Sequence, residues 1–501
     1  MRFTSLIIEL IRARPRLIVW LVILLQAALW FVVPLLLYRS PPGDLATVLA
    51  FGREYQVGTD LGPPLPFWLA DIAFRAAGSH IFGVYLLAQL CSIVTFFTLY
   101  LLARAVVGGQ QAVLAVLLTM TVVVFSSPGV EFGPLVLARP LWALLLLHSW
   151  RLIGQGRRSA WFAWSIEAGL LLLTMPAAIL LLLLIAGFAV ATARGRRTLM
   201  SFDPLFALLV VVVLVLPYLI WLIRADAFVL PPLPALADLG ARAAHGGALL
   251  GRLLLALSGI AILIALNSGW FSRNGEDAPI IYRPPVVSLG RRFVYFFAIV
   301  PALAGSLVSG LFALDHVAGG SGAALLMSGL AVIVASGDLI HLRNERVLRL
   351  VWAGAIAAPA IAVVAGAVFL PWTSGEVTTS LPATMIAQFF GDSFARRTNQ
   401  PLPAVTGDEQ LAGLIALGAA RPHLLLDATP ERTPWLTREK FNQGGGVVVW
   451  RASDTVGTPP AEIARHFPGL VPEVPQTFDW LVNGRQPLLR IGWAIVRPKA
   501  P

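Results

Sequence analysis

The sequence is poor in the residues on which soluble proteins and cofactor sites depend. Its single cysteine, Cys91, excludes an intrachain disulfide and any cysteine-based zinc or iron–sulfur centre. Only 13% of the 501 residues are charged, whereas soluble domains carry roughly 25%. Neither a phosphate-binding P-loop nor an HExxH zinc motif occurs. These absences exclude a soluble globular protein and the commonest nucleotide and zinc sites.

Apolar residues make up 57% of the chain, and the mean hydropathy is +0.80. The runs long enough to cross about 30 Å of hydrocarbon are 17–38, 80–103, 110–127, 135–150, 203–223, 247–267, 293–314, 320–339 and 350–371. A further stretch, 161–193, is too long for one span, and Pro176 divides it into two. The sequence therefore predicts an α-helical polytopic membrane protein with about 11 transmembrane helices.

The net charge of +11 is almost entirely arginine, since only Lys440 and Lys499 are lysines. With the N-terminus inside, 18 arginines fall in cytoplasmic segments and seven in the short outer loops. This bias predicts a cytoplasmic N-terminus, and an odd number of spans places the C-terminus outside. The first span reads as an uncleaved signal anchor. We therefore interpret the basic charge as a topology signal and expect no nucleic-acid partner.

Two regions stand outside the predicted membrane domain of residues 1–371. The first is the loop 39–79, which is rich in polar residues, proline and glycine. The second is the tail 372–501, where no apolar run is long enough to span. The tail alternates helical patterns, such as 382–398, with strand patterns, such as 447–452. We expect a small C-terminal α/β domain on the outer face.

Asp44 is the first acid after the first span. It opens a segment, 44–56, that predicts an interfacial helix in which Leu45, Val48 and Leu49 face lipid or protein while Asp44, Thr47 and Arg53 face elsewhere. A carboxylate at the membrane boundary can act as a general base toward a hydroxyl or amine. The alternative is that Asp44, which follows a glycine, caps the helix N-terminus.

The second outer loop carries Glu131 and Arg139, about two helical turns apart. The acid can position an acceptor or a metal ion, and the planar arginine fork can neutralise a phosphate. The alternative is an interfacial acid and an arginine whose charge reaches the headgroups. Inside the spans, we expect His148 and Asp203 at the membrane boundary, and the place of Glu167 stays open.

Three segments together are similar to the GT-C glycosyltransferases of bacteria, the relatives of protein mannosyltransferases (family 39) and lipid A aminoarabinose transferases. They are GDLATVLAFGREYQVGTDLGPPLPFWL, the region that begins VEFGPLVLARPLW, and AVTGDEQLAGLIALGAARPHLLLD in the tail. The resemblance implies a GT-C-like fold in the bacterial inner membrane with a periplasmic C-terminal domain. It also implies transfer of a sugar from a polyprenyl-phosphate donor, within the membrane lipid, to a lipid or glycan acceptor on the periplasmic side.

The resemblance assigns roles residue by residue. Asp44 matches the catalytic acid of the first outer loop, and Glu131 is the nearest counterpart of an assisting acid in the second. Arg53 and Arg139 are the candidates for binding the donor phosphate. The remaining polar residues of the first loop, Glu54, Tyr55 and Asp60, are candidates for positioning the acceptor. No cofactor is predicted beyond the open question of a divalent metal ion.

The chain departs from the family pattern at three places. Thr47, Gly62 and Met175 stand where many relatives have an acid, a basic residue and a lysine, respectively. These departures are compatible with an altered donor or with a member that no longer catalyses, which would be a scaffold or accessory subunit of envelope glycan assembly. A transporter or flippase is a third possibility, for which inverted repeats are expected; we find no repeat in the sequence.

Overall fold

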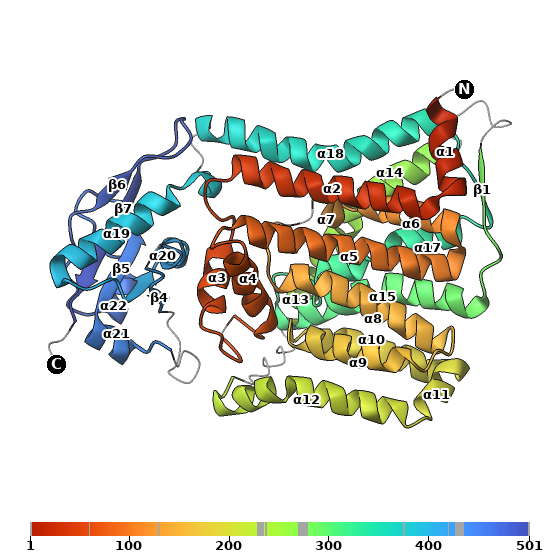
Figure 1. The fold of residues 1–501 in the computed structure, drawn as a ribbon, viewed down its shortest axis with the longest axis horizontal. Helices are drawn as coiled ribbons and strands as arrows, with labels where there is room; N and C mark the ends of the chain where they lie inside the picture. Colours follow the sequence, from red (N-terminus) through yellow and green to blue (C-terminus); the bar gives the residue numbers. More distant parts are fainter. Residues whose placement is uncertain are drawn as a thin grey trace.

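The structure is a computed structural model that describes residues 3–498 except 60, 128, 130, 228–234, 236–237, 269–278, 374–375, 419 and 426–434. It has a large helical part and a small α/β part at one end (Figure 1). The helices of the helical part are α1 (Phe3–Ala13), α2 (Pro15–Leu37), α3 (Leu45–Gly52), α4 (Leu65–Ala76), α5 (Phe82–Val107), α6 (Gly109–Met120), α7 (Val123–Ser126), α8 (Pro134–Ile153), α9 (Ala160–Leu172), α10 (Ala178–Ala191), α11 (Ala193–Leu199), α12 (Asp203–Arg224), α13 (Leu239–Ala256), α14 (Ser258–Asn267), α15 (Ser288–Phe312), α16 (Ser321–Leu325), α17 (Ser328–Ala335) and α18 (Glu345–Phe369).

Every apolar run of the sequence lies largely within these helices, but the helices differ in length. In the part of the chain that the structure describes, six are long and apolar enough to span a membrane: α2, α5, α8, α12, α15 and α18. Two bent pairs, α10 with α11 and α13 with α14, bring the number to eight. The other apolar segments, α6, α9 and Ser321–Ala335, are shorter. Eleven spans, as the sequence predicts, therefore require these short helices to cross as well; α6, for example, ends at Met120 rather than near 127.

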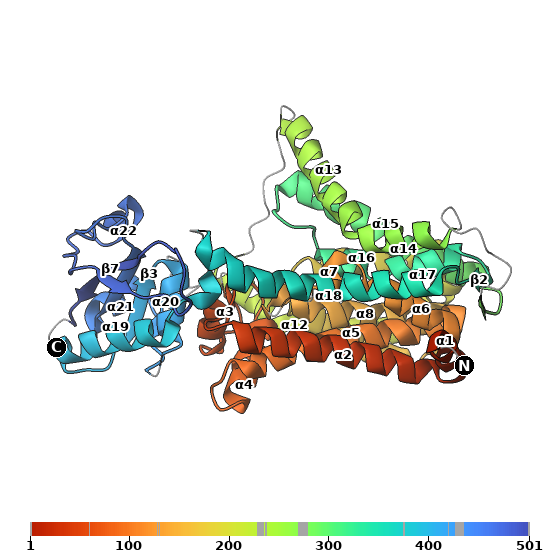
Figure 2. The same cartoon turned by 90° about the horizontal axis from the view of Figure 1, so that it is seen from above.

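The long helices run roughly parallel, with α2, α5 and α8 side by side and α12 on the outer flank beside α9 (Figure 1). Helix α13 packs on α15 and projects from the bundle (Figure 2). Glycines allow this contact, because a Cβ on Gly246 would lie 2.9 Å from the Ser306 carbonyl oxygen. Small residues of this kind let helix backbones approach closely in membranes.

The loop predicted at 39–79 forms helices α3 and α4, which lie between the bundle and the α/β part (Figure 1). All eight residues of α3 are buried, including Thr47. The expectation that Thr47 faces away from lipid and protein is therefore wrong. The reason is that α3 packs against α4 on one side and against α20 (Glu409–Ala416) on another.

The C-terminal part contains α19 (Ala383–Thr398), α20, α21 (Arg438–Gly444) and α22 (Ala461–His466). Its strands are β3 (Ala404–Gly407), β4 (His423–Leu424), β5 (Gly446–Arg451), β6 (Gln476–Phe478) and β7 (Leu489–Val496). They form one sheet in the order β4-β3-β5-β7-β6, parallel on the β4-β3-β5 side and antiparallel on the other. The predicted helix 382–398 and strand 447–452 are confirmed, whereas the sequence analysis missed β6 and α22.

Aromatic packing holds α19 onto the sheet. Phe389 and Phe390 of α19 meet the Trp493 ring of β7, with ring centroids 5.6 and 5.5 Å away. A separate two-stranded sheet, β1 (Ile280–Tyr282) with β2 (Leu339–His341), lies at the opposite end of the molecule, near the N-terminus (Figure 1). The α/β part therefore marks one end of the bundle and the N-terminus the other.

Candidate functional site

Asp44 stands at the N-cap position of α3, at the end of the bundle that faces the α/β part. Its side chain is exposed and makes no cap hydrogen bond. The helix-cap alternative therefore does not account for this carboxylate, which is available to other partners.

Glu131 lies beside Asp44. Its carboxyl carbon is only 2.7 Å from where a Cβ on Gly43 would stand, so the carboxyl packs directly over the Gly43 backbone. Gly43 also has a φ of +51°, a left-handed conformation that glycine adopts readily. Although Glu131 reaches the surface, loss of solvent around its carboxyl, and then the Asp44 charge, raise its pKa. The structure thus places Asp44 and Glu131, the two acids predicted from the sequence, next to each other.

A third carboxylate comes from the C-terminal part. Glu409 opens α20, and its pKa is raised by desolvation first and then by the charges of Asp44 and Asp408. Below it, Gly413 of α20 packs on α3, where a Cβ would lie 3.2 Å from the Thr47 hydroxyl oxygen. Nothing local in the sequence reveals that the start of α20 faces Asp44.

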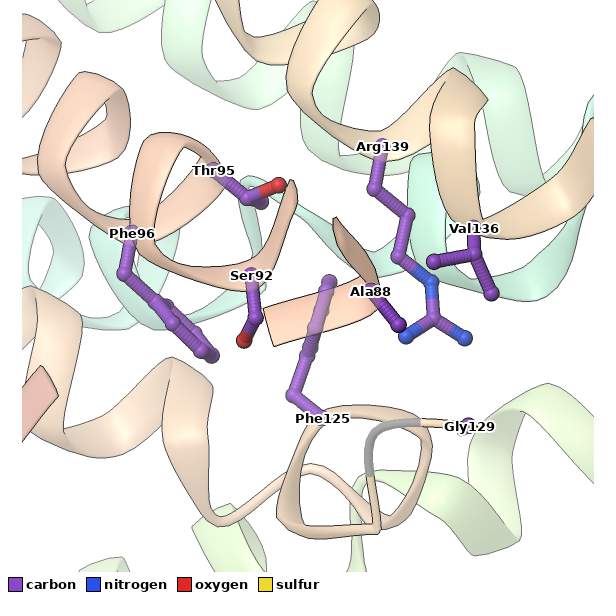
Figure 3. Close-up of a pocket in the computed structure, with 8 residues that line it drawn as sticks. All are labelled: Ala88, Ser92, Thr95, Phe96, Phe125, Gly129, Val136 and Arg139. Carbon is purple, nitrogen blue, oxygen red and sulfur yellow. The ribbon is translucent and has the colours of Figure 1, made fainter. Parts of the chain in front are cut away.

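Arg139 of α8 points into a small cavity between α5, α7 and α8 (Figure 3). The guanidinium carbon lies 5.9 Å from the centroid of the Phe125 ring, and no hydrogen bond or ion pair to a described residue engages the side chain. The cavity, about 10 Å³, has room for one water. A phosphate is too large for this cavity as it stands. Among the described residues, Arg139 is nevertheless a cation without a counter-charge, and it lies near the end of the bundle that carries α3.

The other predicted residues of the first loop gather at the far end of α3. Arg53 is the C-cap residue, nine positions from Asp44, or about 13 Å along a helix axis. One of its guanidinium nitrogens, Nη1, is buried without a hydrogen-bond partner. Burial, followed by the neighbouring Arg421 and Arg75 charges, lowers its pKa against the opposing effect of Glu54. Asp60 lies outside the described residues.

Glu54 and Tyr55 contact the surroundings of α3 rather than Asp44. The His423 Nδ1–H of β4 donates to Glu54 Oε1 at 2.8 Å, so Glu54 joins the first loop to the C-terminal part. Tyr55 lies under the Arg75 guanidinium, 5.6 Å from ring centroid to guanidinium carbon. The structure thus separates the predicted site residues into two groups, Asp44 with Glu131 at one end of α3 and Arg53, Glu54 and Tyr55 at the other.

The second group surrounds an acid that the sequence analysis missed. Asp71 of α4 is completely buried and pairs with Arg421 Nη2 at 2.7 Å and with Arg75 Nε at 2.6 Å. A usable signal was present: Asp71 follows the buried Phe67 and Ala70 and precedes the buried Phe74, so it stands on the apolar stripe of an amphipathic helix. A charge there requires a partner.

Three further acidic and basic residues form pairs inside or near the bundle. His148 is buried inside the protein, and its Nδ1–H donates to Glu167 at 2.9 Å. Its Nε2 accepts from Arg151 at 3.0 Å. Asp203 pairs with the exposed Arg158. The sequence left the location of Glu167 open, and the structure shows it paired with a buried histidine.

The three positions at which the sequence departs from the family pattern carry no charged side chain. Thr47 and Met175 are buried, and Gly62 has a φ of +124° with open space around it. Within the described residues, no group of three or more His, Cys, Asp and Glu side chains is placed to hold a metal ion. The Asp44 charge adds to the raised pKa of Glu131 and of Glu409, but these described carboxylates do not converge as metal ligands, so we derive no step through a metal ion.

Comparison with known proteins identifies the fold. Residues 62–221 match the family model of dolichyl-phosphate-mannose-protein mannosyltransferases. The structure of ArnT from Cupriavidus metallidurans bound to undecaprenyl phosphate is similar at a TM-score of 0.61, with 13% identity over 95% of this chain and 98% of that chain. The chain has the GT-C fold. The apo structure of the same ArnT is similar at a TM-score of 0.51 and 15% identity over the same shares of both chains. No protein of curated function matches the sequence.

GT-C is a fold of membrane glycosyltransferases, and the fold resemblance seen in the sequence is confirmed. The apolar helices and these similarities also make this GT-C chain a multi-pass membrane protein.

Proposed function

We propose that this GT-C protein transfers a sugar from a polyprenyl-phosphate donor to a lipid or glycan acceptor on the periplasmic side of the bacterial inner membrane. The observation that carries the proposal is the exposed Asp44 carboxylate, which caps no helix although it stands at the N-terminus of α3. Glu131 of the second loop and Glu409 of the α/β part lie near enough for their pKa values to respond to its charge. A carboxylate in this setting suits a general base.

The reaction needs little covalent help from the protein. Asp44 takes the proton of the acceptor hydroxyl, the acceptor oxygen bonds to the anomeric carbon, and the bond from that carbon to the phosphate oxygen breaks. The lipid phosphate leaves with the electron pair, and a direct displacement inverts the anomeric centre. The protein contributes orientation and charge neutralisation. The raised pKa of Glu131 makes it the more readily protonated neighbour, which reduces repulsion around Asp44.

We assign the donor phosphate to Arg139 in preference to Arg53. Arg139 has no counter-charge among the described residues, and a phosphate would supply one. Arg53 already lies among Asp71, Glu54 and two arginines, at the end of α3 away from Asp44. The experiment measures binding of undecaprenyl phosphate to the purified protein and to R139Q and R53Q. We expect R139Q to weaken binding at least tenfold and R53Q to change it little. If R53Q weakens binding and R139Q does not, Arg53 is the residue that binds the phosphate.

Transfer itself is tested with the reconstituted protein and a set of undecaprenyl-phosphate sugars, namely hexoses, pentoses and aminosugars, with bacterial lipid extract as acceptor. Product formation with at least one donor supports the proposal. The alternative, a non-catalytic scaffold of envelope glycan assembly, is favoured by the burial of Thr47 and Met175 at positions where relatives carry polar side chains. Binding of undecaprenyl phosphate without transfer from any donor would select that alternative.

A further inference from the structure

A second cavity lies at the end of the bundle opposite Asp44. It is a groove of about 520 Å³ between α1, α2, α6, α14, α17 and α18, a size that can enclose much of a small molecule. In Figure 1 these helices meet near the N-terminus, whereas α3 and the α/β part are at the other end. The walls are apolar, with Ile11 of α1, Leu117 of α6 and Ile333 of α17 among them. Such walls suit a hydrocarbon chain.

The groove has a charged rim on one helix. Glu345 and Arg349 stand one turn apart at the start of α18, and both line the groove. Residues four apart on a helix commonly pair. The Arg349 charge does act on Glu345, but among the described residues no ion pair joins the two and no hydrogen bond holds either side chain. One acid and one base are therefore both available at the mouth of an apolar groove.

Hydrogen bonds hold the backbone at the rim of the groove. The Arg343 backbone N–H donates to the Asn267 side-chain oxygen at 2.9 Å, and the Arg343 guanidinium donates to the Ser268 carbonyl at 3.1 Å. These bonds tie the end of α14 to the segment that leads into α18. On the wall, the Trp352 indole N–H donates to the Leu117 carbonyl at 2.9 Å and fixes the ring. The Glu345 and Arg349 backbone positions are thus held in place.

We infer that this groove binds one membrane glycerophospholipid with an amino-phosphate headgroup, such as phosphatidylethanolamine. Arg349 would bind the phosphate, Glu345 the ammonium group, and the apolar walls an acyl chain. This charge pattern disfavours a polyprenyl phosphate, whose headgroup has no cation to offer Glu345. The site is also separate from Asp44, so the inference stands independently of the proposed transfer reaction.

Native mass spectrometry of the purified protein tests the inference with equimolar phosphatidylethanolamine and phosphatidylglycerol. We expect one phosphatidylethanolamine to be retained in preference. R349Q should lower its occupancy at least fivefold, whereas E345Q should keep a lipid but lose the preference for the amine headgroup. The matched control is R346Q, because Arg346 is exposed on the same helix and does not line the groove.

A second variant separates lipid loss from misfolding. S336W leaves both charges in place and fills the groove from its exposed Ser336 wall, so it should lose the lipid while keeping the size-exclusion profile of the parent. Equal lipid retention in R349Q and R346Q would overturn the inference. Equal binding of both phospholipids by the parent protein would overturn it as well. Displacement of phosphatidylethanolamine by undecaprenyl phosphate would also overturn it, because the groove would then bind the carrier lipid of the donor.

Discussion

Arg421 reaches across from the C-terminal part to the buried Asp71 of α4 and donates to its carboxylate at 2.7 Å. Together with His423–Glu54, this pair fastens the α/β part to the first outer loop. The fastening matters because the same loop carries Asp44, so the α/β part fixes how Glu409 approaches the candidate base.

The first prediction concerns this junction. R421Q leaves the fully buried Asp71 with the half-exposed Arg75 and the Tyr55 hydroxyl as partners. Loss of a charged hydrogen bond to a buried carboxylate costs about 1.5–3 kcal/mol. R75Q is the matched control, and its effect should be below about 1 kcal/mol because solvent screens that partner. Thermal unfolding and proteolysis between α18 and α19 measure both; equal effects of the two variants would contradict the assignment.

The second prediction concerns Gly43. G43A forces a Cβ into the Glu131 carboxyl at a left-handed φ of +51°, which costs about 1–2 kcal/mol in backbone strain alone. We expect transfer to fall by about tenfold to a hundredfold, since a 1 Å misplacement in an active site can cost that much. Gly133 is the matched control, because its φ is −171° and a Cβ there meets nothing within 4 Å. Equal activity of G43A and G133A would count against a site at Glu131.

The third prediction follows from the raised pKa of Glu131. The native protein holds the proton more tightly than the unfolded chain, so stability falls as the pH rises from about 4.5 through the raised native pKa. E131Q lacks this carboxyl, so its stability relative to the parent should increase over that pH range and then level off. Denaturation midpoints measured from pH 4 to pH 8, on the order of one reading per half pH unit, test the sign. A difference that stays flat with pH would show that folding does not shift the pKa of Glu131, and a difference that shrinks would show that folding lowers it.

The fourth prediction concerns the buried pair in the bundle. H148F removes the partner of Glu167, whose side chain is 11% exposed. Breaking a buried pair by removing one partner costs about 3–5 kcal/mol. D203N breaks the pair with Arg158, whose side chain is 73% exposed, and should change the unfolding temperature little. Parallel thermal melts in one detergent compare them, and a D203N loss as large as that of H148F would contradict the distinction.

Sequence alone predicts the helical membrane domain and the α/β tail because both leave local signals. Long apolar runs mark α2, α5 and α18, and the alternation of apolar and polar residues marks α19 and β5. Asp44 and Glu131 were found because each is an isolated acid beside a span. Their approach could not be derived, since 87 residues separate them and the contact depends on the backbone of Gly43.

The contacts between the first loop and the tail could not be predicted from the sequence either, because the residues that form them are far apart along the chain. Arg421 and Asp71 are 350 positions apart, and no local pattern indicates that one faces the other. The helix predicted at 44–56 is present as α3, which ends at Gly52. The expectation for Thr47 was wrong because hydropathy reports how apolar a helix is and not whether protein covers it. In α3 protein covers all faces, as α4 and α20 pack against it.

The central claim is that Asp44 accepts the proton of the acceptor, and D44N tests it most directly. The variant keeps the shape of the side chain and removes its basicity. With the reconstituted protein and a donor that the parent accepts, we expect D44N to lower the transfer rate by about 10²- to 10⁴-fold while undecaprenyl phosphate still binds as it does to the parent. A D44N protein that transfers the sugar at the parent's rate would contradict the account.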